Sequence, residues 1–185
     1  MDTDTFNPDA LIKQMERFPR VLAAFVEPLT SDALFFVPPT GAWSIAQILG
    51  HLADEEVEDF RMRTRLTLEM PDAGWPPIDP EGSVRERNYQ QPSLSPELAN
   101  KPHESLARFV TERSTSIAWL HSLQNPDWSA AHVHPKFGPL HAGMLLGSWC
   151  AHDLLHLRQI TKRLYEMTNN LSAPYSTRYA GDWVA

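Results

Sequence analysis

Apolar residues recur every three or four positions over four long stretches of the chain, the spacing of a helix face that points inward. The first stretch follows Asn7 and Pro8, which suit a helix cap and a first-turn proline. Its apolar stripe is Leu11, Met15, Phe18, Leu22, Phe25 and Leu29. The second stretch opens at Ser44, where Gln47 completes a capping box, and extends to about Met70. We expect Pro19 and Pro28 to kink or end the first helix.

A third helix is predicted from about Ser95 to Asn125, and a fourth from about Leu140 to Asn169. The core face of the third comprises Leu98, Leu106, Phe109, Val110, Ile117, Leu120 and Leu123. Residues 71–93 between the second and third helices hold many turn residues and no periodicity. A connection of this length is typical of a lid, a binding loop or a disordered segment.

No stretch shows the alternation of a strand, so residues 127–139 are predicted to be a loop. The tail, about 170–185, carries Tyr175, Tyr179 and Trp183, which we expect to cover one end of the fold or to pack on a partner. The 185 residues suit one all-α domain, 1–185, with the architecture of a four-helix bundle.

Composition narrows the class of protein. Hydrophobic residues at 42% and charged residues at 21% are typical of a globular protein. A formal net charge of −7 and the lack of any basic run argue against nucleic-acid binding. No apolar run approaches the about 20 residues of a membrane-spanning helix, and no secretion signal is evident. The one cysteine, Cys150, excludes an internal disulfide, suits a cytoplasmic protein and is expected to be core filler.

Three histidines occupy positions where these helices should carry apolar residues: His51 on the second helix, and His152 and His156 on the fourth. The last two are four residues apart and therefore lie on one helix face. The stripe that they interrupt is Leu145, Trp149, His152, His156, Ile160 and Leu164. Burying an imidazole without a partner costs about 1–3 kcal/mol, and a shared divalent ion removes that cost. The spacing alone leaves open whether these histidines bind a metal or are ordinary core residues.

Carboxylates lie near His51. Glu55 follows one turn later on the same stripe, so it is the first candidate for a general base, a fourth ligand or a partner for a ligating histidine. Asp54 and Glu58, which flank it, are alternatives, and a surface role for Glu55 also stays open. Glu56 and Asp59 are expected to face solvent.

Other histidine chemistry is less specific. Two interpretations are open for the three further histidines His132, His134 and His141. They either line the entrance to the site and relay protons, or they are simply solvated, and solvation is favoured for His132. The H-E-x-x-H pattern of zinc proteases is absent, and so are the paired Glu-x-x-His motifs of di-iron bundles.

The histidine-bearing segments 43–52, 134–140 and 152–160 resemble those of the DinB/YfiT superfamily of metalloenzymes, in order and in spacing. The likeness covers nearly the whole chain, although Gln47 stands where the family often has an acid. The resemblance implies an up-down-down-up four-helix bundle, with the long linker as crossover between the second and third helices. It also implies a divalent metal, nickel or zinc, on His51, His152 and His156, and a homodimer.

Three functions are compatible with these features. In the first, which the resemblance favours, the ion activates a low-molecular-weight thiol for transfer to an electrophile. In the second, a hydrolase, the open ligand position holds water and Glu55 accepts its proton. The third is a non-catalytic stress protein that binds a metal or another ligand. All three imply a small-molecule ligand and no membrane or nucleic-acid partner, and the sequence does not separate the first two.

Overall fold

The computed structural model describes residues 5–89 and 101–183, and most of these residues are helical. The long helical segments are α1 (Pro8–Val26), the continuous run of α3 (Ile45–Glu55), η1 (Glu56–Arg61) and α4 (Met62–Glu69), α7 (Lys101–Ser122) and α8 (Ala142–Ser172). The shorter helices are α2 (Ser31–Leu34), α5 (Pro80–Glu86) and the 3-10 turn η2 (Arg178–Ala180). The predicted start of the third helix at Ser95 lies outside the described residues, which place α7 from Lys101 onward.

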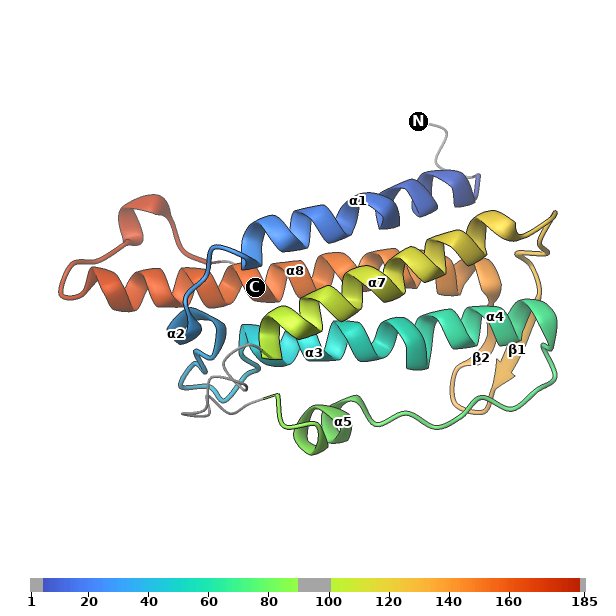
Figure 1. The fold of residues 1–185 in the computed structure, drawn as a ribbon, viewed down its shortest axis with the longest axis horizontal. Helices are drawn as coiled ribbons and strands as arrows, with labels where there is room; N and C mark the ends of the chain where they lie inside the picture. Colours follow the sequence, from blue (N-terminus) through green and yellow to red (C-terminus); the bar gives the residue numbers. More distant parts are fainter. Residues whose placement is uncertain (1–4, 90–100, 184–185) are drawn as a thin grey trace.

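Figure 1 shows how the four long segments lie side by side. α1 and α8 run in one direction, and the α3–α4 run and α7 run in the other, so their order along the chain is up, down, down, up. The connection that carries α5 passes along the outside of the bundle, from the end of α4 back towards the start of α7 (Figure 1). The predicted four-helix bundle is therefore confirmed.

The first helix begins as predicted and buries a slightly different face. Asn7 caps it, since its side-chain oxygen accepts a hydrogen bond from the Ala10 N–H at 3.0 Å. The helix continues through Pro19 and ends at Val26, so Leu29, the last residue of the predicted stripe, lies beyond it. Because 3.6 residues make a turn, Val26 takes the inward position after Leu22, and Phe25 is 39% exposed. The prediction for Phe25 was wrong for this reason.

The second helical segment contains a feature that periodicity did not predict. Its start is confirmed, because Ser44 and Gln47 make both hydrogen bonds of a capping box. The segment then passes through a π-helical turn at Glu56–Arg61 before α4. Such wide turns occur often at functional sites. Every residue of α3 is buried, so this helix is covered on all sides rather than along one stripe.

Residues 127–139 were predicted to be a loop without strands, and this was wrong in part. β1 (Ala131–His134) and β2 (Gly138–His141) pair in antiparallel register, with Val133 opposite Pro139. Strands of four residues are too short to produce a readable alternation, and Gly138 supplies the positive φ of 73° that the turn needs.

The linker and the tail also differ from expectation. The described part of the linker contains α5, which Asp79 caps. In the tail, Tyr175 and Tyr179 are largely exposed, so they do not cover an end of the bundle, whereas Trp183 packs on Tyr165 of α8 with ring centroids 5.4 Å apart. None of the helices in the described part of the chain has both the length and the apolar character needed to cross a membrane.

Candidate metal centre

The bundle brings the three predicted histidines together in its interior. His51 comes from α3, and His152 and His156 come from successive turns of α8. The Nε2 atom of His152 lies 3.3 Å from Nε2 of His51 and 2.9 Å from Nε2 of His156. One ring nitrogen of each residue lies within 4.8 Å of the other two, so a single ion could contact all three.

Burial keeps these imidazoles uncharged. Desolvation lowers the pKa of His51 to about 3, of His152 to about 2 and of His156 to about 4, and their mutual repulsion adds to the effect at His51 and His152. A neutral imidazole has one nitrogen with a free lone pair, which is the form that binds a metal. The three rings therefore need no deprotonation at neutral pH to bind a metal.

Neighbouring side chains fix the orientation of the rings. The Nδ1 atom of His156 donates a hydrogen bond to Oε1 of Gln159 at 2.9 Å, and this bond leaves Nε2 of His156 unprotonated. The ring of Trp43 packs against His51 with centroids 4.9 Å apart, and Phe60 packs against His152 at 4.8 Å. Ligand histidines are commonly held by such a second hydrogen bond and by packing.

The nitrogen spacing fits a shared ion. Zinc binds imidazole at about 2.0–2.1 Å with tetrahedral angles, which places two ligand nitrogens about 3.3 Å apart. The two separations at His152, 3.3 and 2.9 Å, are close to this value. One proton on His152 cannot satisfy the lone pairs of both His51 and His156 well, whereas a cation shared by the three nitrogens can. Three protein ligands also leave a position for an outside molecule.

A cavity of about 290 Å³ opens beside His51. Its lining comes from carboxylate side chains of the α3–α4 run and from the linker with the start of α5. The linker contributes Pro76, Pro77, Ile78, Asp79, Pro80 and Ser83. The segment predicted to be a lid or binding loop therefore lines the cavity next to the histidines.

Glu55 lines this cavity together with His51, as its position on the helix predicted. Burial raises the pKa of Glu55 to about 8, and a hydrogen bond with Asp59 and the charge of Asp59 add to the shift. Asp59 in turn pairs with Arg63 at 2.9 Å and is only 14% exposed in its side chain, so the expectation that Asp59 faces solvent was wrong. Glu55 thus carries a carboxyl group that exchanges its proton near neutral pH.

The two alternatives to Glu55 also line the cavity, and both are engaged by arginine. Asp54 is buried and bound by Arg87, by Arg108 and by the hydroxyl of Tyr89, whose Oη lies 3.2 Å from the carboxylate. Arg87 also pairs with Glu58 at 2.6 Å. The bonds of Arg87 attach the end of the linker to α3 and η1. Of the three carboxylates that this helical run contributes to the cavity, Glu55 is the one for which the described residues supply no arginine hydrogen bond.

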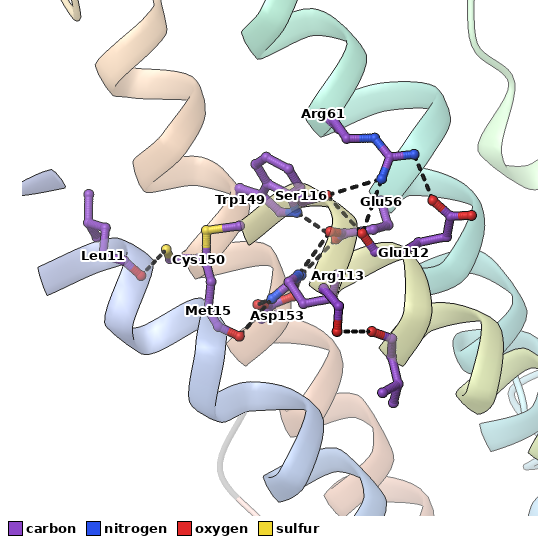
Figure 2. A network of polar contacts seen from close by, with 12 residues as sticks. Leu11, Met15, Glu56, Arg61, Glu112, Arg113, Ser116, Trp149, Cys150 and Asp153 are labelled. Carbon is purple, nitrogen blue, oxygen red and sulfur yellow. Dashed lines mark hydrogen bonds and ion pairs between the residues drawn. The ribbon is translucent and has the colours of Figure 1, made fainter. Parts of the chain in front are cut away.

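Glu56 was expected to face solvent, and this was wrong. Glu56 is 1% exposed and lies in a buried network in which Arg113 of α7 makes two bonds to it, at 2.9 and 2.8 Å, and two more to Asp153, at 2.7 and 2.8 Å. Trp149 donates its indole N–H to Glu56 at 2.8 Å. Figure 2 shows these side chains converging from three helices.

Sequence reasoning did not identify Arg113, although a signal was present. Arg113 falls in the apolar stripe of α7, four residues after Phe109 and four before Ile117. A charged residue at such a position needs buried partners of opposite charge, here Glu56 and Asp153. Burial opposes ionisation of Arg113, but the hydrogen bonds and charges of Asp153 and Glu56 raise its pKa above the usual value.

The remaining histidines do not join the cluster. His132 stacks on Trp75 with centroids 4.3 Å apart, and its Nδ1 lies 3.1 Å from the Pro71 carbonyl oxygen, so the hairpin contacts the start of the linker. His132 is half-buried rather than simply solvated, and His141 is exposed. Cys150 is core filler as predicted: it is 2% exposed, and burial raises its pKa to about 11.

Comparison with known proteins agrees with this architecture. A family model described as the DinB superfamily matches residues 14–160. A protein of Oceanobacillus iheyensis is 27% identical over 152 residues, which cover 81% of each chain. A protein of Bacillus licheniformis is 24% identical over 169 residues, which cover 89% of this chain and 90% of the relative. Both relatives carry the name "Putative metal-dependent hydrolase".

A solved structure is similar over nearly the whole length. YfiT from Bacillus subtilis, described as "a probable metal-dependent hydrolase with an unusual four-helix bundle topology", superposes with a TM-score of 0.75. The match covers 91% of this chain and 93% of YfiT, at 22% sequence identity. At this level of identity the likeness establishes the fold alone.

Proposed function

The chain belongs to the DinB superfamily, and from this premise we propose that it is a divalent-metal-dependent hydrolase whose ion is held by His51, His152 and His156. The observation that carries the proposal is the convergence of three uncharged imidazole nitrogens, 2.9 and 3.3 Å apart at His152, beside a cavity. The names of the Oceanobacillus and Bacillus relatives support it. Zinc and nickel both suit a site of three imidazoles, and we propose one of these two.

A divalent ion on three histidines supplies Lewis acidity and lowers the pKa of a bound ligand such as water or a thiol. The chain itself supplies a proton carrier. Glu55, with a pKa raised to about 8, can accept a proton from the attacking molecule and return it to a leaving group. The linker wall, rich in proline, limits the access of solvent and the size of the substrate.

The nucleophile must come from outside the chain if it is a thiol. The chain's single cysteine, Cys150, lies in the core, and its pKa is raised to about 11. Water as the nucleophile gives hydrolysis, and a small thiol gives the transferase that the sequence resemblance favoured. This second function stays a prediction, and it requires a thiol as co-substrate.

One activity screen separates the two functions. We expect purified protein loaded with zinc or nickel to hydrolyse a panel of activated esters and amides without added thiol. Protein treated with a chelator should be inactive and should recover when the metal is returned. Thiol-dependent loss of monochlorobimane, without hydrolysis of any ester or amide, would favour the transferase instead.

Two variants assign the parts of the site. His152→Ala should lose both metal and activity. Glu55→Gln should keep the metal and lose about 10²-fold or more in kcat, which is the usual contribution of a general acid or base. The matched control is Glu86→Gln, an exposed carboxylate on α5, which should retain full activity. Full activity in Glu55→Gln would remove this residue from the mechanism.

A further inference from the structure

A second cavity, of about 430 Å³, shares no residue with the one beside His51. It is nevertheless in contact with the supports of the histidine cluster. Two of its lining residues are Trp43, which packs on the ring of His51, and Gln159, which accepts the hydrogen bond from His156. Its volume lies in the range of cavities that bind small molecules.

The charged residues that line this cavity are mostly basic. Lys162 and Arg163 come from consecutive positions of α8, and Glu81 of α5 is the acidic group in the lining. The side chain of Glu81 is 78% exposed, so its charge is well screened by water, whereas Arg163 is 4% exposed. The buried charge in the lining, on Arg163, is therefore positive, and its ion-pair partner Glu166 is not among the lining residues and is 23% exposed in its side chain.

Arg163 has hydrogen-bonding capacity that the described residues do not use. Its Nε lies 3.2 Å from a carboxylate oxygen of Glu166, but neither Nε nor Nη1 makes a hydrogen bond within the described part of the chain. Arg113, the other deeply buried arginine, makes four bonds to two carboxylates. Buried donors without acceptors cost free energy, and such a group at the wall of a cavity is explained by a ligand that supplies the acceptors.

We propose that this second cavity binds the oxyanion group, a carboxylate or a phosphate, of a small molecule. The planar guanidinium of Arg163 matches the paired oxygens of an oxyanion, and the ammonium of Lys162 adds a second positive charge. Trp43 and Ile48, which also line the cavity, form an apolar wall for the rest of the ligand. This site does not depend on the metal, so it can be tested independently of the proposed function.

The test is a titration of metal-free protein with inorganic phosphate and, in a second arm, with benzoate, followed by the NMR signal of the Trp43 indole N–H. We expect a saturable shift with at least one probe, and the responding probe identifies the type of oxyanion. Arg163→Met should weaken binding at least about tenfold, and Lys162→Met should weaken it less. Arg20→Met, which removes an exposed arginine of α1, should leave the affinity unchanged.

Two further variants keep the outcome decisive. Arg163→Lys retains the charge without the planar fork, and it should bind with intermediate affinity even if Arg163→Met does not fold. His152→Ala should bind the anion as the unmodified protein does, because the cavity does not include the histidines. No saturable shift with either probe, equal affinity in the Arg163 variants, or loss of binding in His152→Ala would overturn the proposal.

Discussion

Two polar clusters lie next to each other in the interior and differ in how their charges are satisfied. Glu55 lines the cavity beside His51, and His152 belongs to the histidine cluster. The residues that follow them, Glu56 and Asp153, bind Arg113. In the arginine cluster, each carboxylate receives two hydrogen bonds from the guanidinium. In the histidine cluster, three nitrogens lie close together, and residues 5–89 and 101–183 place no cationic side chain among them.

The difference distinguishes a structural polar group from a functional one. Arg113 contacts both apolar clusters of the core: its guanidinium lies 4.8 Å from the ring of Phe109 in one and 5.7 Å from the ring of Trp149 in the other. It has its counter-charges and needs no ligand (Figure 2). The histidine cluster holds three neutral rings whose nitrogens contact mainly one another, and the described residues give it no charged partner of this kind. Burial alone therefore does not mark a functional site; the type of partner distinguishes the two clusters.

The largest effect should follow from breaking the arginine cluster. Arg113→Met leaves Glu56 and Asp153 buried without a counter-charge, and the free energy of unfolding should fall by about 3–5 kcal/mol. Urea denaturation of metal-free protein measures this loss. The control is Arg61→Met, because the pair of Arg61 with Glu112 is partly exposed and should be worth no more than about 1 kcal/mol. A similar small loss in both variants would contradict a structural role for the arginine cluster.

A substitution in the histidine cluster should lower metal affinity rather than the stability of the metal-free protein. His152→Ala should weaken metal binding by at least about 100-fold, since it removes the nitrogen that lies close to both others, while metal-free protein loses little stability. Metal content after desalting, measured by mass spectrometry, checks the first effect, and urea denaturation checks the second. His132→Ala, a half-buried histidine of the hairpin, serves as the control. Stoichiometric metal in His152→Ala would refute the assignment of the ligands.

The histidine cluster was predicted from sequence, and the arginine cluster was not, although the place of Arg113 in the apolar stripe of α7 indicated that it is buried. Helical spacing placed His51, His152 and His156 on inward faces, because an imidazole in an apolar stripe is visible in the periodicity. Glu56 was misplaced because a single stripe was assumed for a helix that is buried on every side. The π-helical turn and the contact of Glu56 with Arg113, 57 positions away in sequence, depend on packing between helices. Periodicity within one helix contains no information about such a partner.

The pH dependence of stability at Glu55 is a finer test of the difference between the two polar clusters. Its pKa in the folded protein, about 8, lies above the ordinary value of 4.5, so the fold favours the protonated form. The contribution of Glu55 to the free energy of unfolding is fully present below pH 4.5 and is lost as the pH rises through 8. Glu55→Gln should therefore stabilise metal-free protein at pH 8 and have almost no effect at pH 4.5. Thermal unfolding at both pH values, with Glu86→Gln as control, measures the difference, and an equal effect at the two pH values would contradict it.

The smallest effect concerns the support of a ligand rather than a ligand itself. Gln159→Met removes the acceptor for the Nδ1 proton of His156, so the ring no longer favours the tautomer with a free Nε2. We expect metal affinity to fall about tenfold, measured by competition with a chelating dye, and the nitrogen NMR signals of His156 to report a mixed tautomer. Gln14→Met is the matched control, because Gln14 bonds the carbonyl of Cys150 and not a histidine. A tautomer change without a change in affinity would mean that the ion itself selects the ring form, and that packing against Trp43 and Phe60 is sufficient to orient the cluster.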